Sequence, residues 1–446
     1  MKRIKLIIES LSPLAIGKEK PGGSISEVEK YIPGSVIRGA VAKQILSCYP
    51  ELKTQNLDIT PKNGENNDFQ KLFLDDSPAI FHNAYPAVAK GTDGYEKIED
   101  IPIKVLPATA VSSKANPGFI TYDKHGVFDT LIDSFCAQQF NHPYDPSSLK
   151  ALEEKIDPRV EAFSCFYSRK QEKNQEKNKN IYYIYRTHAV TSRLLTRTGI
   201  NRRRATVAED ILYSIEVLNE QFQIKKDDGN NSWENYIYSS DIIMYDNELS
   251  RKLTNFINNK QNIFRIGASK SRGLGKVKIK AQLDKPNNTV KQRIKDFNSK
   301  LQERFQNWSN VFTKVTNNPF ENECKFFTIN LHSEAVLIEN WQRTTVISKS
   351  MLKQFTGIED ESLELHVAYS SYDYRSGWNS AWGLMKDVEL VTNKGAVYLF
   401  STEDIKSWYD ALFKLELTGV GERNSEGFGQ IEICNEFHLV FRENPA

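Results

Sequence analysis

Arginine is concentrated in one short stretch of this chain. Five arginines fall within twelve residues, with an asparagine among them: Arg193, Arg197, Asn201, Arg202, Arg203 and Arg204. The planar guanidinium group pairs with phosphates and stacks on bases, and threonine, serine and asparagine add neutral donors. The stretch is therefore typical of a surface that binds a polyanion. The alternative is a surface that pairs with acidic segments elsewhere in the chain.

The sequence around these arginines indicates how they are held. Residues 210–217 alternate like a strand, so we expect a hairpin or loop at a sheet edge, where a single strand of nucleic acid can lie. The net charge of the chain is only +2, but residues 186–208 and 249–283 are basic and contain no acid. Two such stretches in a nearly neutral chain indicate a localised surface for a polyanion, and solvated basic faces remain the alternative.

A glycine-rich turn lies in the second basic stretch. Glycine lets successive backbone N–H groups approach a phosphate, and several cations surround this turn. We predict phosphate contacts from Lys270, Ser271, Arg272, Gly273, Gly275 and Lys276. The residue order of a P-loop is absent, so nucleotide hydrolysis is not expected.

The glycine turn occurs twice. Residues 271–279 (SRGLGKVKI) are echoed by residues 425–433 (SEGFGQIEI), and in both copies a Gly-x-Gly turn runs into an alternating strand. A repeated unit of this kind usually means a repeated domain. The second copy carries Glu422, Glu426 and Gln430 where a phosphate site would need cations. We therefore predict a structural or protein-contact role for the second turn.

Aromatic side chains gather between residues 369 and 386. Tyr374, Arg375 and Trp378 could stack on bases, so we include them among the RNA-binding candidates. Aromatic clusters also form cores and protein interfaces, and that alternative stays open.

Support for catalysis is poor. The seven histidines form no close pair and no H-E-x-x-H motif. His188, beside the arginine stretch, is the best candidate base of a metal-independent RNA nuclease, but a lone histidine is usually structural. The five cysteines are far apart, which argues against a zinc site and against disulfides. We predict no catalytic residues, no metal and no cofactor.

The composition is that of an ordinary globular protein. A chain of 446 residues is long enough for two or more domains, and no run of about 18 apolar residues is present. The first residues enter an alternating strand rather than the apolar core of a signal peptide. We therefore expect a cytoplasmic protein without a membrane segment.

Two similar units are expected along the chain. In the first, the strand 4–10 leads to a Pro-Gly turn and to a helix with Ser35 as N-cap and Arg38 in its first turn. In the second, Ser333 followed by Leu337 mirrors Ser10 followed by Leu14. Val290, Ile294, Phe297, Leu301, Phe305 and Trp308 predict an amphipathic helix between the units.

The predicted class is α+β, and the predicted boundaries follow from these elements. The first domain spans 1–285, with large insertions around 47–185, the connecting helix spans 286–323, and the second domain spans 324–446. A β-α-β-β-α-β unit needs roughly a hundred residues, so the second copy is near minimal in length and the first is much longer.

Three motifs together resemble the RAMP superfamily of CRISPR-associated proteins. Residues 33–40 (PGSVIRGA) are similar to the first-helix motif of the family, and residues 271–275 and 426–429 are similar to its glycine-rich loops. A narrower likeness is to the large double-RAMP subunit of type III-D effector complexes. It rests on residues 72–77, 82–86, 197–202 and 377–384.

The resemblance implies two ferredoxin-like, RRM-like domains with glycine-rich loops. It also implies a non-catalytic subunit that binds the 5′ handle of a crRNA, lies near target RNA, and docks against the large signature subunit and backbone RAMP subunits. Arg38, the segment 197–204 and the loop 270–276 would then contact the RNA. Two alternatives remain, a RAMP endoribonuclease that processes CRISPR transcripts and a general RRM-like RNA-binding protein.

Overall fold

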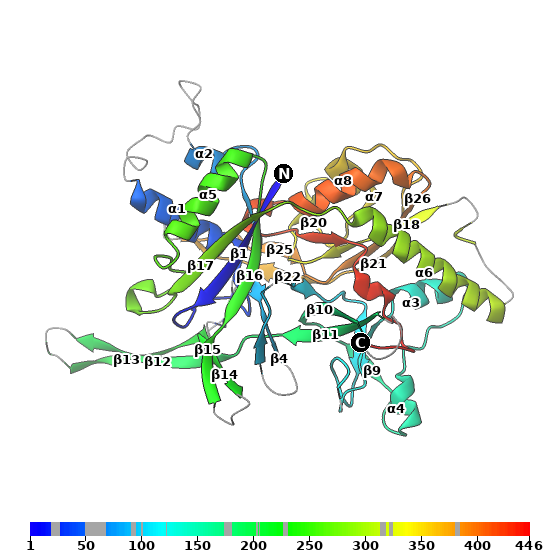
Figure 1. Ribbon diagram of the computed structural model, residues 1–446, viewed down its shortest axis with the longest axis horizontal. Coiled ribbons are helices and arrows are strands. Elements are labelled where there is room, and N and C mark those ends of the chain that lie inside the picture. Colours follow the sequence, from blue (N-terminus) through cyan, green and yellow to red (C-terminus); the bar gives the residue numbers. More distant parts are fainter. Residues whose placement is uncertain are drawn as a thin grey trace.

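The two halves of the protein each contain an antiparallel sheet, of five strands in the first half and four in the second, and a long helix and a large insertion accompany them (Figure 1). The computed structural model describes residues 1–18, 27–49, 68–90, 95–99, 101–121, 123–173, 181–201, 204, 206–225, 231–312, 318–320, 324–379 and 384–446. A mixed α/β fold with antiparallel sheets confirms the predicted class at this level.

The first sheet has the strand order β17-β1-β16-β2, and β3 also pairs with β16. Its strands are β1 (Lys2–Ser10), β2 (Ile80–Phe81), β3 (Tyr85–Pro86), β16 (Ile237–Met244) and β17 (Val277–Asp284). The accompanying helices are α1 (Gly34–Cys48), α2 (Asp68–Phe73) and α5 (Asn247–Asn259). The alternate residues Ile4, Leu6 and Ile8 of β1 are fully buried, and they share one core with α1 and α5.

The start of α1 differs from the sequence prediction. The helix begins at Gly34 with Pro33 as N-cap, so the prediction of Ser35 as N-cap is wrong. The Gly34 N–H instead donates to Asn83 Oδ1 over 2.8 Å. A side chain distant in sequence therefore satisfies this helix end, and Ser35 moves into the first turn, where it lines a cavity.

The second sheet has the strand order β21-β26-β18-β27. Its strands are β18 (Lys325–Leu331), β21 (Glu364–Tyr369), β26 (Val397–Thr402) and β27 (Ile431–Ile433), and its helices are α7 (Lys349–Thr356) and α8 (Ile405–Thr418). When β3 and α2 of the first half are left aside, four sheet strands and two helices follow the order β-α-β-β-α-β in both halves, which is the order of ferredoxin-like units. In each half the first and third of the four sheet strands lie at the centre of the sheet.

Helix α6 (Val290–Val311) lies between the two sheets in sequence and packs on the second core. Val290, Ile294, Phe297, Leu301 and Phe305 are its buried residues, as the amphipathic pattern predicted. Asn298 ties the helix to the first strand of the second sheet, because its amide donates to the Phe326 carbonyl over 2.7 Å.

A large insertion separates β3 from β16. Its strands are β4 (Val88–Lys90), β5 (Tyr95–Lys97), β6 (Lys104–Val105), β7 (Ala110–Ser113), β8 (Val127–Asp129), β9 (Val160–Ala162), β10 (Phe166–Lys173), β11 (Ile181–His188), β12 (Ser192–Asn201), β13 (Thr206–Leu218), β14 (Gln221–Lys225) and β15 (Asn231–Asn235). Its helices are α3 (Leu131–Gln139) and α4 (Leu149–Glu153). Helix α3 packs in the second core against α6, so the insertion of the first half also stabilises the second.

The hairpin β12–β13 extends away from the body of the protein (Figure 1). It carries the arginine stretch, as the sequence predicted. Two shorter hairpins belong to the second half. The first joins β19 (Leu337–Glu339) to β20 (Gln342–Thr344); the second joins β22 (Tyr372–Arg375) to β25 (Glu389–Thr392) and contains the pair β23 (Trp378–Asn379) and β24 (Leu384–Met385).

The two glycine turns have the same backbone. Ser269 and Arg423 are left-handed, a single 3-10 turn follows each of them, and Gly273 and Gly427 are left-handed again. The Gly275 N–H donates to the Pro13 carbonyl over 2.9 Å, and the Gly429 N–H donates to the Glu334 carbonyl over 2.8 Å. The repeat in the sequence is thus a repeat of backbone hydrogen bonds.

The register of this repeat corrects one expectation. Ser12 Oγ accepts the Lys276 N–H over 2.8 Å, and Ser333 Oγ accepts the Gln430 N–H over 2.8 Å. Ser333 therefore corresponds to Ser12, and the predicted correspondence with Ser10 is wrong by two residues. The hydroxyl that ends the strand, rather than the strand pattern, fixes the register.

Within the described part of the chain, no helix has both the length and the apolar composition needed to cross a membrane.

We predict that the two glycines of the first turn differ in how much stability is lost when alanine replaces them. Gly273 and Gly275 have φ values of 86° and 81°, but only at Gly275 would a Cβ lie close to backbone, 2.1 Å from the Ile266 carbonyl oxygen. Gly273→Ala is expected to cost about 1–3 kcal/mol for the left-handed backbone alone, and Gly275→Ala more than that. Urea unfolding of the two variants measures the difference.

Gly39→Ala is the control, because no atom lies within 4 Å of its added Cβ and its backbone is helical. It should be neutral or stabilising by up to about 1 kcal/mol. A Gly275→Ala protein as stable as Gly273→Ala would contradict the prediction.

Candidate nucleic-acid interface

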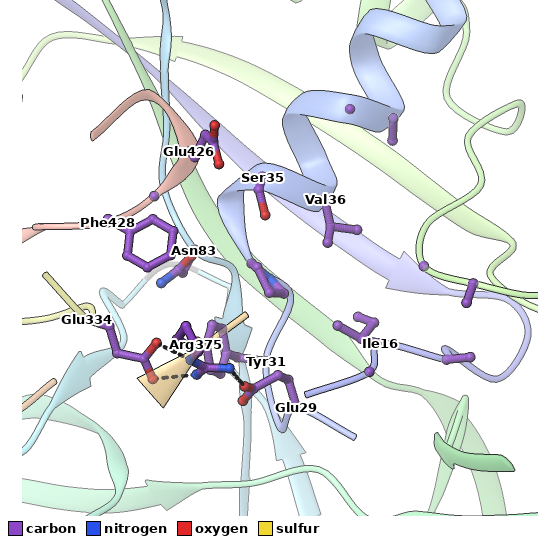
Figure 2. Close-up of a pocket in the computed structure, with 18 of the residues that line it drawn as sticks. Ile16, Glu29, Tyr31, Ser35, Val36, Asn83, Glu334, Arg375, Glu426 and Phe428 are labelled. Carbon is purple, nitrogen blue, oxygen red and sulfur yellow. Dashed lines mark hydrogen bonds and ion pairs between the residues drawn. The ribbon is translucent and has the colours of Figure 1, made fainter. Parts of the chain in front are cut away.

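A cavity of about 630 Å³ lies where helix α1 meets both glycine turns (Figure 2). Its lining combines the first turn of α1 with parts of each glycine turn: Pro33, Ser35, Val36 and Gly39, then Gly267, Ala268 and Lys270, then Arg423, Glu426, Gly427 and Phe428. Three motifs that are far apart in the sequence therefore form one site. The volume is within the range of about 300–1,000 Å³ that ligand sites have.

Two glycines bring α1 against the second turn. A Cβ on Gly34 would lie 3.0 Å from the Gly427 Cα, and a Cβ on Gly427 would lie 2.6 Å from Asn83 Oδ1. The same Asn83 oxygen accepts the Gly34 N–H. Neither glycine leaves room for a side chain, so the close backbone approach sets the wall of the cavity.

A buried ion-pair cluster closes one side of the cavity (Figure 2). Arg375 donates to both oxygens of Glu334, over 2.7 and 2.5 Å, and to Glu29. The side chains of all three are at most 9% exposed. Although burial alone would lower the pKa of Arg375, the hydrogen bond and charge of Glu334 raise it, so the guanidinium stays charged. Glu29 belongs to the first half and Glu334 to the second, so Arg375 joins them.

Arg423 also lines the cavity, in the second glycine turn. It pairs with Glu389 over 2.6 Å and with Glu426 over 2.7 Å, and its guanidinium lies over the Phe428 ring. Burial would lower its pKa, but the hydrogen bond to Glu426 and the charges of Glu426 and Glu389 raise it. The charge of Arg423 is thus matched by carboxylates within the protein.

Lys270 differs from the two arginines. Among the described residues, none forms a hydrogen bond or ion pair with its ammonium group. Burial, and then the charge of Lys43, lower its pKa. A cation in this position is stabilised by an anion that enters the cavity, since the anion replaces the lost hydration.

The arginine hairpin reaches the first glycine turn. Arg197 donates to the Arg272 carbonyl over 3.1 Å, and the Arg272 guanidinium donates to the Tyr213 hydroxyl over 2.5 Å. Arg193 is exposed and pairs with Glu220 over 2.9 Å. The structure therefore brings Arg197 against Arg272, in the same turn as Lys270, and we call these three residues the basic surface. Arg193 lies four residues before Arg197 on β12 and is paired with a carboxylate.

The remaining predicted residues are distributed around this surface. Ser271, Arg272, Gly273 and Lys276 are exposed on the first turn, and Arg204 is exposed beyond the end of β12. Gly275 is buried, and its backbone N–H is held by Pro13. Arg202 and Arg203 lie outside the described residues, as do the side chains of Asn201 and Trp378.

Arg38 faces another part of the protein. Its guanidinium donates to the Phe73 carbonyl over 2.5 Å and lies 5.5 Å from the centre of the Phe73 ring. It therefore satisfies the C-terminal end of α2. Tyr374 is 46% exposed, and its strand leads to the buried Arg375, so the aromatic segment adjoins the second turn rather than the basic surface.

His188 is not placed on the basic surface. Its side chain is 2% exposed, and its Nε2 lies 2.8 Å from Ser168 Oγ. Burial, and then the charge of Arg186, lower the pKa of His188 to about 3, so the ring is neutral at physiological pH. Within the described ranges, no group of His, Cys, Asp or Glu side chains could hold a metal ion.

Sequence reasoning missed several residues of the cavity: Glu29, Ser35, Asn83, Glu334, Arg423 and Phe428. The positions of Glu29 and Glu334 depend on Arg375, which joins the two halves, and that of Asn83 depends on its hydrogen bond to Gly34. One sequence carries no signal for such distant contacts. The repeat in the sequence does give a signal for Arg423, because Arg423 is equivalent to Ser269 of the first turn. The structure confirms that both residues have a left-handed backbone.

A model of the RAMP superfamily matches residues 7–278, which is more than half of the chain. The chain belongs to the RAMP superfamily. The resemblance seen in the sequence is confirmed at this level. No curated protein sequence is significantly similar to this RAMP protein.

Solved structures of CRISPR proteins match this RAMP protein weakly. A chain of the type III-B Cmr-beta complex bound to cognate target RNA and AMPPnP is 12% identical, with 91% of this chain and 88% of that chain covered and a TM-score of 0.34. The Csm3-Csm4 subcomplex of a type III-A interference complex is 12% identical, with 89% and 92% covered and a TM-score of 0.30. A Cas6-related protein from Pyrococcus furiosus is 9% identical, with 98% and 99% covered and a TM-score of 0.30. At these scores the likeness carries no argument of its own.

The buried cluster gives a stability prediction. Arg375→Met leaves Glu29 and Glu334 buried without a cation, and breaking a buried pair costs about 3–5 kcal/mol. Adding Glu29→Gln and Glu334→Gln removes both charges and should recover most of that loss. Chemical denaturation of the single and triple variants measures this recovery.

Arg343→Met is the matched control, because its side chain is 34% exposed and its pairs lie at the surface. It should change stability by about 0–1 kcal/mol. If Arg343→Met and Arg375→Met lowered the free energy of unfolding equally, the buried cluster would stabilise the protein no more than a surface ion pair does.

Proposed function

We propose that this RAMP protein is a non-catalytic RNA-binding subunit of a type III CRISPR effector complex, and that it binds the 5′ handle of the crRNA. The observation that carries the proposal is the convergence of α1 and both glycine turns on one cavity, next to the arginine hairpin. Membership of the RAMP superfamily supports it.

Electrostatics supports an RNA strand on the first half. The first turn presents Lys270, Arg272 and Lys276 around Gly273, which has open space beside its Cα. Phosphates bind such cations and backbone N–H groups, while unpaired bases are read by stacking and hydrogen bonds. The handle would run from the arginine hairpin across the first turn, with a nucleotide in the cavity.

Two ferredoxin-like, RRM-like units fit this arrangement. We assign residues 1–285 and 324–446 to the two units, with the connecting helix in 286–323. The shared element order and the matching hydrogen bonds of the two turns support this division. The packing of α3 in the second core means that the two units are stabilised together.

Because His188 is buried, the structure favours a protein that binds RNA over one that uses this histidine to cleave it. A general base must come within hydrogen-bond reach of the hydroxyl that it deprotonates, and His188 is buried against Ser168. The nuclease alternative therefore receives no support from this residue.

The cations of the first turn and of the adjacent hairpin give a binding prediction. Arg197→Ala, Lys270→Ala and Lys276→Ala should each weaken the binding of single-stranded RNA that contains the repeat. Each lost phosphate contact should reduce the slope of log affinity against log salt by about 0.7. Fluorescence anisotropy at several salt concentrations measures both quantities.

Lys406→Ala and Lys414→Ala are the matched controls, because both are exposed lysines on α8. They should leave the affinity and the salt slope unchanged. Equal weakening in the controls would contradict the proposed surface. A discrete cut in the labelled RNA that His188→Ala abolishes would instead identify an endoribonuclease.

A further inference from the structure

Large apolar side chains are exposed together on the second half. They belong to the hairpin β19–β20 and to the longer hairpin that joins β22 to β25, and β20 contacts β25. Their exposed fractions range from 46% to 100%: Trp341, Tyr372, Tyr374, Leu384, Met385 and Val388. We call these six residues the apolar patch. Patches larger than a few hundred Å² on a protein surface mark interaction sites. A fully buried aromatic residue removes about 150–250 Å² from water, so the three aromatic members give a partner much to bury.

Trp341 is the most unusual member of the apolar patch. It is 100% exposed, and together with Asn340 it forms a two-residue turn. The φ values are 49° for Asn340 and 65° for Trp341. Such turns favour glycine, asparagine and aspartate, and a bulky residue there is strained by about 1–3 kcal/mol. Because the indole is fully exposed, packing against the described residues does not offset that strain. Strain of this kind concentrates at functional positions.

The charges around the apolar patch disfavour RNA. Arg343 pairs with Glu422 over 3.2 Å and with Glu389 over 3.5 Å. Arg423 pairs with Glu389 and Glu426. Two arginines are thus paired with three glutamates. Lys386 is also exposed here, next to Asp387, so four carboxylates face three cations around the apolar patch. Leucine, methionine and valine also have no flat ring on which a base could stack.

The same charges favour a protein partner. Protein interfaces have cores rich in tryptophan, tyrosine and methionine and depleted of charge, surrounded by a polar rim. The apolar patch has this composition, and its acidic rim complements lysine and arginine. Its partner therefore has an apolar surface with a basic rim.

We propose that the apolar patch is the surface on which another protein subunit of the same complex docks, and that RNA binds only the first half. The proposal rests on the proposed function for the identity of the partner. It assigns opposite roles to the two glycine turns, which share a backbone but differ in charge.

Trp341→Gly tests the proposal with little risk to folding, because glycine relieves the left-handed strain. The tagged chain is co-expressed with a repeat-containing transcript and with the proteins encoded beside it, and the purified complex is analysed for each subunit and for RNA. Trp341→Gly, alone or with Met385→Ser, should weaken binding of one subunit by about 30-fold or more, which is the loss at an interface hot spot. RNA affinity and the thermal midpoint should not fall.

Ile120→Ser and Leu152→Ser are matched controls, because these residues are 52% and 51% exposed at other sites. They should retain every subunit. The proposal is overturned if Trp341→Gly retains all subunits, if it loses RNA affinity, or if the wild-type chain dimerises through the apolar patch. A failure of the proposed function would look different, because the wild-type chain itself would then not bind RNA. Subunit binding is measured separately from RNA binding in the same experiment.

Discussion

The contact between Gly34 and Gly427 is the constraint on which the rest of the site depends. At this point the first turn of α1 and the second glycine turn meet backbone to backbone, and Asn83 bridges them. Any side chain at either position would separate the two halves by the width of at least one carbon atom. The cavity, the ion-pair cluster around Arg375 and the alignment of both glycine turns all follow from that approach.

The two sides of the cavity have different chemistry although their backbones match. On the first side Lys270 has no carboxylate partner among the described residues, and the Arg272 guanidinium contacts the hydroxyl and the ring of Tyr213. On the second side carboxylates neutralise both Arg423 and Arg343. The roles that we propose for the two halves, RNA binding for the first and protein docking for the second, depend on this difference in charge.

The sequence was sufficient for features that depend on local periodicity. The strand that contains Ile4, the helix that contains Phe297, the arginine hairpin and the repeat of the glycine turns could all be predicted. It was insufficient where the partner is far away along the chain. Ser35 looked like a helix cap, but Asn83 takes that role, and Arg375 resembled a nucleic-acid ligand until Glu29 and Glu334 were seen to enclose it.

The matching hydrogen bonds of the two glycine turns have an evolutionary consequence. Backbone carbonyls, the serines Ser12 and Ser333, and glycines hold both turns, so most side chains on their outer faces take no part in folding. If the two turns descend from one ancestral unit, an arginine at the position of Arg272 and a glutamate at that of Glu426 could be exchanged without unfolding the turn. One backbone could then serve two different ligands.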